Sequence, residues 1–128
     1  MRFLLDTHIW LWFVIDPQRL TQNILQELKG PKNELWLSPI STWEALTLHK
    51  KGRVQLLGDL TEWVARATVG IKEAVMTHEI ATAALELPLH KDPSDRIIAA
   101  TALVLQLTLV TADRRLFDLA NIKTLANR

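Results

Sequence analysis

The clearest candidates for chemistry in this sequence are four carboxylates that lie far apart along the chain. Asp6 and Asp113 come shortly after short apolar runs, whereas Glu44 and Asp95 lie near the start of segments with a helical pattern. Four carboxylates that converge on one cleft repel each other, and protonation or a bound divalent cation relieves that repulsion. Mg²⁺ and Mn²⁺ prefer oxygen ligands and stabilise charge at phosphorus. The predicted reaction class is therefore metal-dependent hydrolysis of phosphodiesters.

Each acid also has a structural explanation, because Asp and Ser side chains commonly cap helix N-termini. Ser41 and Glu44 have the spacing of a capping box, with Ser41 as the N-cap. Asp92 and Asp95 repeat that spacing, with a proline at the first helical position between them. Asp113 fits the N-cap of the helix that it begins. Helix caps do not need to lie close together in the fold, whereas metal ligands do. Convergence of the acids therefore distinguishes metal binding from capping.

Short apolar runs alternate with longer amphipathic segments, a pattern typical of strands separated by helices. Runs that are apolar at every position indicate buried strands, so we predict an α/β fold with a parallel sheet covered on both faces. Right-handed crossovers bring the C-terminal ends of such strands to one edge, where ligands bind. Strands are predicted at 3–5, 35–37, 71–76, 107–110 and 122–125, and helices at 7–15, 21–29, 41–51, 59–68, 77–86, 92–105 and 113–119.

This edge of the predicted sheet is where three of the four acids are expected. Asp6, Glu44 and Asp113 all follow predicted strands within a few residues. Asp95 joins them only if the beginning of the helix at 92–105 points toward the same edge, which the topology alone leaves open.

The residues around the acids resemble the motifs of a known family. Residues 4–8 (LLDTH), with Trp12 shortly after, are similar to the opening of PIN-domain ribonucleases. Residues 43–44, 90–102 and 109–113 resemble the second, third and fourth acidic positions of that family, in the same order and with matching separations. The VapC-type toxins of bacterial toxin–antitoxin pairs are the subgroup that the sequence resembles most.

The resemblance implies a three-layer α/β/α sandwich with a central, mainly parallel sheet, and a Mg²⁺- or Mn²⁺-dependent endoribonuclease. It also implies a homodimer and inhibition by a small antitoxin whose C-terminal segment enters the acidic site. By this resemblance the catalytic and metal-binding acids are Asp6, Glu44, Asp95 and Asp113, and the supporting residues are Thr7, Thr111 and Asp92.

Basic residues close to the acids are candidates for contacts with RNA phosphates. Arginines that flank Asp95 and Asp113 can hold a phosphate through paired hydrogen bonds, or neutralise the acids in the resting protein. Basic residues at the end of a helix can instead stabilise its C-terminus. The candidates are Arg96, Arg114 and Arg115 beside the acids, and Lys50, Lys51 and Arg53 at the end of a predicted helix, while His8 and His90 are the histidines expected near the cleft.

Tryptophan is frequent in this sequence, with five residues. Trp10 and Trp12 are two positions apart on a predicted helix and cannot share a face, so one is expected in the core and the other at an interface. Trp36 and Trp43 are predicted to be core residues.

Composition excludes several other chemistries. The sequence contains no Cys, which rules out a thiol nucleophile, a disulfide scaffold and Cys-ligated zinc. Its net charge of +1 gives no global indication of binding to nucleic acid or membrane. The longest uncharged run, 97–112, is shorter than the ~20 residues of a spanning helix, so we expect a soluble, cytoplasmic protein with no membrane partner. No linker or repeat divides the chain, which we interpret as one domain, 1–128.

Two other functions compete with the nuclease hypothesis. A phosphoacceptor receiver domain has a similar length and strand-end acids, but it carries an acidic pair after its first strand, where this chain has Asp6 followed by Thr7 and His8. It also needs a Lys after a late strand, where this chain has Asp113. A catalytically silent PIN-like binding module is the other alternative, and the complete set of four acids argues against it.

Overall fold

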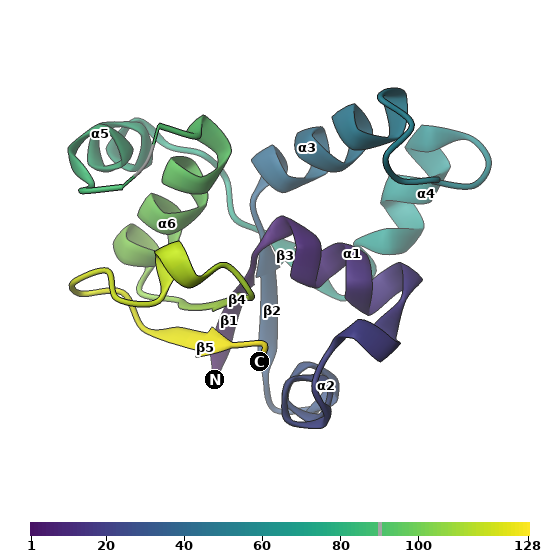
Figure 1. Cartoon of the computed structure of the whole chain (residues 1–128), viewed down its shortest axis with the longest axis horizontal. Coiled ribbons are helices and arrows are strands. Elements are labelled where there is room, and N and C mark those ends of the chain that lie inside the picture. Colours follow the sequence, from purple (N-terminus) through teal and green to yellow (C-terminus); the bar gives the residue numbers. More distant parts are fainter. Residues whose placement is uncertain (90) are drawn as a thin grey trace.

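The computed structural model describes residues 1–89 and 91–128, and shows a central sheet with helices on both sides (Figure 1). None of the helices in these residues is both long and apolar enough to cross a membrane. The strands are β1 Arg2–Leu5, β2 Glu34–Leu37, β3 Ile71–Glu73, β4 Thr108–Thr111 and β5 Thr124–Ala126, the α-helices are α1 Thr7–Ile15, α2 Gln22–Lys29, α3 Pro39–Lys50, α4 Leu60–Ala67, α5 His78–Glu86 and α6 Pro93–Leu105, and 3₁₀ turns span Pro17–Arg19 and Arg114–Leu116.

The sheet has five strands in the order β3-β2-β1-β4-β5, and every neighbouring pair is parallel. Leu4 in β1 pairs with Trp36 of β2 on one side and with Leu109 of β4 on the other. β1 is therefore the central strand, with β2 and β4 beside it, as expected for a strand with a continuous apolar run. The predicted parallel sheet is confirmed.

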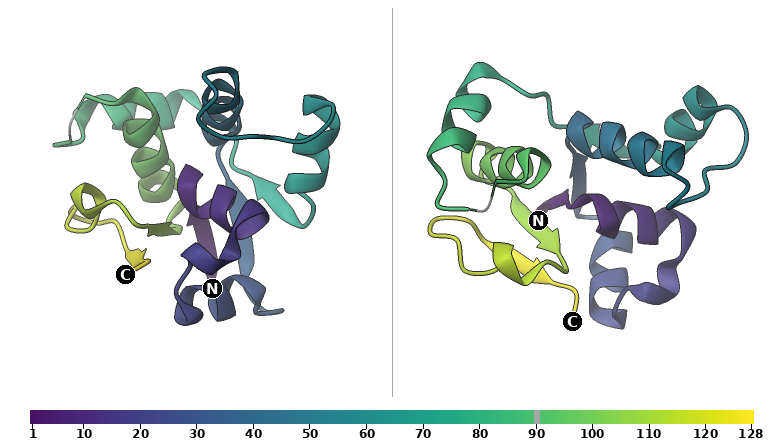
Figure 2. Two further views of the ribbon diagram at one scale, coloured as in Figure 1. Left: turned by 45° about the vertical axis from the view of Figure 1, so that its right-hand side comes forward. Right: turned by 45° about the horizontal axis from the view of Figure 1, so that its top comes forward.

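Side chains of the central strands alternate between two hydrophobic clusters, one on each face of the sheet. Phe3 and Leu5 pack in a cluster with buried residues of α1, α2 and α4, whereas Leu4 packs with α6 on the opposite face. α5 packs against α6, and α3 contacts both α1 and α6 (Figures 1 and 2). The three-layer α/β/α architecture is thus confirmed.

The order in which strands are added reverses between β1 and β4. The chain adds β2 and β3 on one side of β1, and then returns to add β4 and β5 on the other side. The connection after β1 therefore runs to one side of the sheet and the connection after β4 to the other, which leaves a crevice at the C-terminal ends of these two strands. Asp6 and Asp113 follow these two strands directly or nearly so.

Helix α3 begins earlier than the sequence predicted. Pro39 occupies the first helical position, and the Oγ of Ser38 caps the helix by accepting from the amide of Ile40 at 3.2 Å. Ser41 therefore lies inside the first turn, where it is fully buried. The capping-box interpretation of Ser41 and Glu44 is wrong, because the fixed φ of Pro39 suits the helix start and Ser38 supplies the cap.

Two further elements are shorter than predicted. The strand predicted at 71–76 ends at Glu73, after which the chain turns toward the start of α5. The helix predicted at 113–119 is a single 3₁₀ turn, Arg114–Leu116, whose N-cap is Asp113. This confirms the expectation that Asp113 caps the element that it begins.

The tryptophans divide between the core and the surface. Trp10 is fully buried and donates from Nε1 to the carbonyl oxygen of Ala67 at 2.9 Å, while Trp12 on the other side of α1 is only half-buried. Trp36 is half-buried against the α6 cluster. The prediction that Trp43 is a core residue is wrong, since 60% of its surface is exposed on the outer face of α3.

Candidate active site

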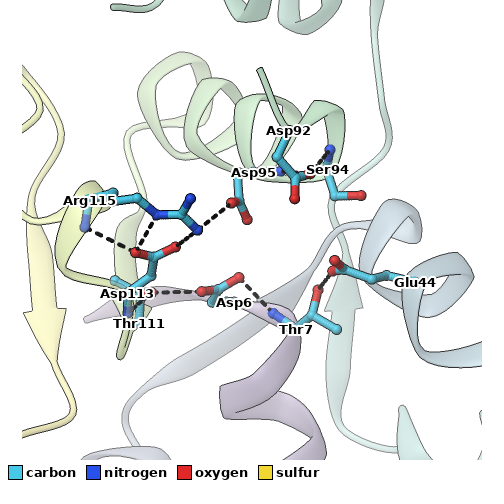
Figure 3. A network of polar contacts seen from close by, with 9 residues as sticks. All are labelled: Asp6, Thr7, Glu44, Asp92, Ser94, Asp95, Thr111, Asp113 and Arg115. Atoms are coloured by element: carbon cyan, nitrogen blue, oxygen red, sulfur yellow. Dashed lines mark hydrogen bonds and ion pairs between the residues drawn. The ribbon is translucent and has the colours of Figure 1, made fainter. Parts of the chain in front are cut away.

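All four predicted acids line one cavity of about 210 Å³ at the C-terminal ends of β1 and β4. They come from the end of β1, from α3, from the first turn of α6 and from the loop after β4 (Figure 3). The beginning of α6 does point to this edge, so Asp95 joins the other three acids, which the topology alone had left open. The cavity is lined by Asp6, His8, Trp12, Glu44, Asp92, Asp95, Ala112, Asp113 and Arg115.

Asp6 lies at the bottom of the cavity, with 7% of its surface exposed. Its Oδ1 caps α1 by accepting from the amide of Thr7 at 2.9 Å, and its Oδ2 accepts from the hydroxyl of Thr111 at 2.6 Å. Burial, together with the nearby carboxylate of Asp95, raises the pKa of Asp6 to about 6 despite the lowering effect of the two hydrogen bonds. Asp6 is thus charged at neutral pH, but its charged form destabilises the folded protein, and a bound cation would relieve this destabilisation.

Glu44 reaches the cavity from the second turn of α3 and is half-buried. The hydroxyl of Thr7 donates to Oε1 of Glu44 and lies 3.0 Å from the Oγ of Ser41. Burial raises the pKa of Glu44, and the carboxylates of Asp95 and Asp92 act in the same direction. Ser41 is the site residue that sequence reasoning missed, because its place three residues before Glu44 indicated a cap.

Asp92 and Asp95 occupy different environments at the start of α6. The Oδ1 of Asp92 accepts from the amides of Ser94 at 2.9 Å and Asp95 at 3.4 Å, and the rest of Asp92 is exposed. Asp95 is 9% exposed and projects into the cavity (Figure 3). The helix N-terminus favours negative charge at both positions, but only Asp95 is buried among the other acids.

Arg115 bridges two of the acids across the cavity. Its Nε lies 3.1 Å from Oδ1 of Asp113 and its Nη2 lies 2.8 Å from Oδ2, so the guanidinium holds that carboxylate with two parallel bonds. The same Nη2 is 3.6 Å from Oδ2 of Asp95 (Figure 3). Of the two predicted roles for Arg115, neutralising the acids is the one seen in this structure.

Arg96 holds neighbouring backbone in place. Its guanidinium donates to the carbonyl oxygens of Leu85 at 2.7 Å, Leu87 at 3.0 Å and Leu89 at 2.6 Å. These bonds fasten the end of α5 and the segment after it to α6, and the phosphate contact of Arg96 stays a prediction.

The other predicted basic residues lie on the surface. Lys50, Lys51, Arg53 and Arg114 are exposed, and their contacts with RNA remain predictions. His8 is exposed and lines the acidic cavity as expected, whereas the prediction for His90 falls outside the described residues.

The donor set of the cavity fits a hard divalent cation in its chemistry. Four carboxylates surround one space, and two of them have raised pKa values because burial has deprived them of solvent. Within residues 1–89 and 91–128, no three His, Asp or Glu side chains form a group that would hold a metal ion as they stand. The guanidinium of Arg115 already supplies one positive charge between Asp95 and Asp113.

Comparisons with known proteins point to one family. A family model described as PIN domain matches residues 3–122. The sequence is 35% identical over 115 residues to Ribonuclease VapC22 of Mycobacterium tuberculosis, and the match covers 88% of each chain.

Solved structures with the same fold include toxin–antitoxin complexes. VapBC2 from Rickettsia felis, bound to a DNA fragment from its promoter, matches with a TM-score of 0.74 at 17% identity over 98% of each chain. DNA-bound VapBC from Salmonella typhimurium matches with a TM-score of 0.71 at 16% identity, over 100% of this chain and 99% of that one.

Proposed function

The chain belongs to the PIN-domain family, and from that premise we propose that it is a metal-dependent endoribonuclease and the toxin of a toxin–antitoxin pair. The observation that carries the proposal is the convergence of Asp6, Glu44, Asp95 and Asp113 on one cavity. The relative Ribonuclease VapC22 supports RNA as the substrate class. The likeness to VapBC complexes supports a fold shared with toxins that have an antitoxin partner.

In this proposal the four acids hold Mg²⁺ or Mn²⁺, which supplies a polarised water and stabilises charge at the phosphorus that is attacked. The chain's own residues prepare the site. Thr111 and the amide of Thr7 fix the carboxylate of Asp6, and the Thr7 hydroxyl fixes Glu44. Arg115 lies at the rim of the cavity. There its guanidinium can release Asp113 and bind a substrate phosphate with the same pair of parallel hydrogen bonds.

The proposed partner is a small antitoxin whose C-terminal segment enters the acidic cavity. A cavity lined by five carboxylates favours a basic side chain, which would balance the same charges as a metal ion. A homodimer and a cytoplasmic location, where RNA substrates are found, complete the proposal. Exposed apolar residues on and before α5, namely Val75, Met76 and Leu85, are candidates for a surface between subunits.

Cleavage of RNA should depend strictly on a divalent cation. Purified protein is expected to cut single-stranded RNA in Mg²⁺ or Mn²⁺ and to stop in excess chelator, because the acids that line the cavity are proposed to act through a bound cation. Gel analysis of a labelled RNA measures both. Cleavage that persists in excess chelator after repurification, and that disappears when the acids are substituted, would contradict the metal role. A chain that binds RNA but never cuts it would favour the silent module.

Replacing Arg115 by Gln should increase the affinity for Mn²⁺ severalfold. The guanidinium competes with an incoming cation for Asp95 and Asp113, so its removal leaves those acids to the metal. Calorimetric titration with MnCl₂ measures the change, and the metal-free melting temperature is expected to fall at the same time, because repulsion among the acids is unmasked.

The neighbouring Arg114 provides a matched control, since it is also exposed and also follows Asp113. Arg114→Gln removes the same charge from the chain without touching the acids, so it should leave the Mn²⁺ affinity unchanged. Equal effects of the two substitutions would mean that net charge, and not the bridge made by Arg115, controls metal binding.

A further inference from the structure

A second cavity, of about 470 Å³, adjoins the acidic one and shares two of its walls. It lies between α1, the 3₁₀ turn Pro17–Arg19 and the end of α3 with the loop that follows. His8 and Trp12 line both cavities, so the two spaces lie next to each other along α1, and we refer to them together as the groove. Leu48 and Val54 contribute aliphatic surface at the far side.

The shared wall of the groove consists of two aromatic rings. The ring centroids of His8 and Trp12 are 5.9 Å apart, with an angle of 53° between the rings. His8 is exposed and Trp12 is half-buried, so flat ring surface is accessible beside the acids. The sequence predicted one of Trp10 and Trp12 in the core and the other at an interface; Trp10 is buried, and Trp12 lies on the border between the two cavities.

The far end of the groove carries positive charge. The guanidinium carbon of Arg19 lies 5.5 Å from the centroid of Trp12, and Arg19 is also 3.5 Å from the carboxylate of Asp16. Arg53 lines the same cavity, is exposed, and has no acidic group within ion-pair distance in residues 1–89 and 91–128. The groove thus passes from five carboxylates, past two aromatic rings, to two guanidinium groups and the carboxylate of Asp16.

Resting on the proposed function, we propose that this second cavity binds the nucleotide next to the bond that is cleaved, with its base against Trp12 and His8 and its phosphate against Arg53. Proteins that recognise single-stranded RNA stack its bases on aromatic rings or on the plane of an arginine, and hold its backbone with cations. Because the two cavities share a wall, a strand whose phosphodiester lies at the acids places its neighbouring nucleotide here.

The charge at this end favours RNA over a peptide segment of the antitoxin. A peptide that brings a basic residue to the acids would have its flanking part beside Arg53; because Asp16 pairs with Arg19, Arg53 is the charge here that repels a further basic residue. A polyanion meets the opposite situation, since its phosphates are attracted at this end and bound through cations at the other.

Binding of a fluorescein-labelled, single-stranded 12-nucleotide RNA tests the proposal. Fluorescence anisotropy is measured with the Asp95→Asn chain, which holds the probe uncut, and with the same chain carrying one additional substitution. Trp12→Leu should weaken binding about tenfold or more, which is the effect of losing one stacked base, and Trp12→Phe should retain most of the affinity. Arg53→Gln should reduce the slope of log affinity against log salt by about 0.7, the value for one phosphate of a single strand.

Two controls separate stacking from general damage. Trp43→Leu removes an exposed tryptophan that lines neither cavity, and it should leave binding unchanged. An RNA of equal length with abasic sites keeps every phosphate but no base, so its weaker binding should be indifferent to Trp12→Leu. Unchanged circular dichroism and an unchanged Mn²⁺-induced shift in melting temperature, in the chain with Asp95 intact, establish that the Trp12 variants are folded.

The outcomes distinguish this inference from the proposed function. If the wild-type chain cuts RNA but folded Trp12→Leu binds the probe as tightly as its parent, the base site is wrong and the nuclease stands. If Trp12→Leu binds RNA normally but no longer responds to the antitoxin, the groove belongs to the protein partner, which also overturns the proposal. If the wild type neither cuts nor binds RNA, the proposed function itself has failed.

Discussion

Asp95→Asn is expected to abolish RNA cleavage, with a loss of more than about 100-fold, while the protein remains folded. Even groups that only support a metal ligand cost roughly 10–100-fold when they are removed, and Asp95 is proposed as a ligand itself. Asn presents a neutral oxygen, which is a poor ligand for a hard cation. Asp95 is buried beside Asp6, so losing its charge should leave the metal-free melting temperature unchanged or raise it.

Asp92→Asn is the matched control, because it changes the same atoms one helical turn away. Asp92 caps α6 through the amides of Ser94 and Asp95, and Asn caps a helix about as well as Asp. It should keep most of the cleavage activity and most of the Mn²⁺-induced rise in melting temperature, whereas Asp95→Asn should lose both. The reverse result would mean that Asp92 is the metal ligand and Asp95 the cap. If neither substitution has an effect, the metal site does not include the start of α6.

Asp6→Asn is expected to stabilise the metal-free protein at pH 8 and to inactivate it. The pKa of Asp6 is about 6 in the folded protein against 3.8 as its usual value, so the charged form costs of the order of 3 kcal/mol of folding free energy. Asn removes that cost while its Oδ1 still accepts from the Thr7 amide, and its Nδ2, in the place of Oδ2, donates to the oxygen of the Thr111 hydroxyl.

The dependence on pH identifies the cause of this stabilisation. Because the folded pKa is the higher one, the folded protein binds the extra proton between pH 3.8 and about 6, so the wild type recovers stability as the pH falls through that window. Urea denaturation in chelator should therefore show a large gap between Asp6→Asn and wild type at pH 8 and a smaller gap at pH 5. A gap that is independent of pH would exclude the buried charge as its origin, and Asp118→Asn, on the surface, should show no gap.

The convergence of the acids was largely predictable, because sheet topology determines it. Parallel strands with right-handed crossovers bring the residues that follow β1 and β4 to one edge, so Asp6 and Asp113 needed no knowledge of side-chain packing. Asp95 joined them because Asp92 and Pro93 start α6 at that edge.

The contacts among the site residues were beyond prediction from sequence. The bond from Thr7 to Glu44 depends on the distance between α1 and α3, and Ser41 became its neighbour only because Pro39 begins that helix earlier. The bridge made by Arg115 depends on one rotamer of an exposed side chain on a 3₁₀ turn. Such details follow from tertiary packing, which local sequence patterns do not encode.

Because β1 lies at the centre of the sheet, the candidate site is completed late in the synthesis of the chain. β1 is the first strand to be synthesised, but its second edge is completed only by β4, and Asp113 follows β4. A nascent chain that has emerged as far as α5 has Asp6 and Glu44 but lacks the other two acids. Pairing of β1 with β4 across such a long stretch of chain is also slow, because the chain loses loop-closure entropy before the contacts between the strands form. The four acids are thus brought together only after nearly the whole chain has been translated.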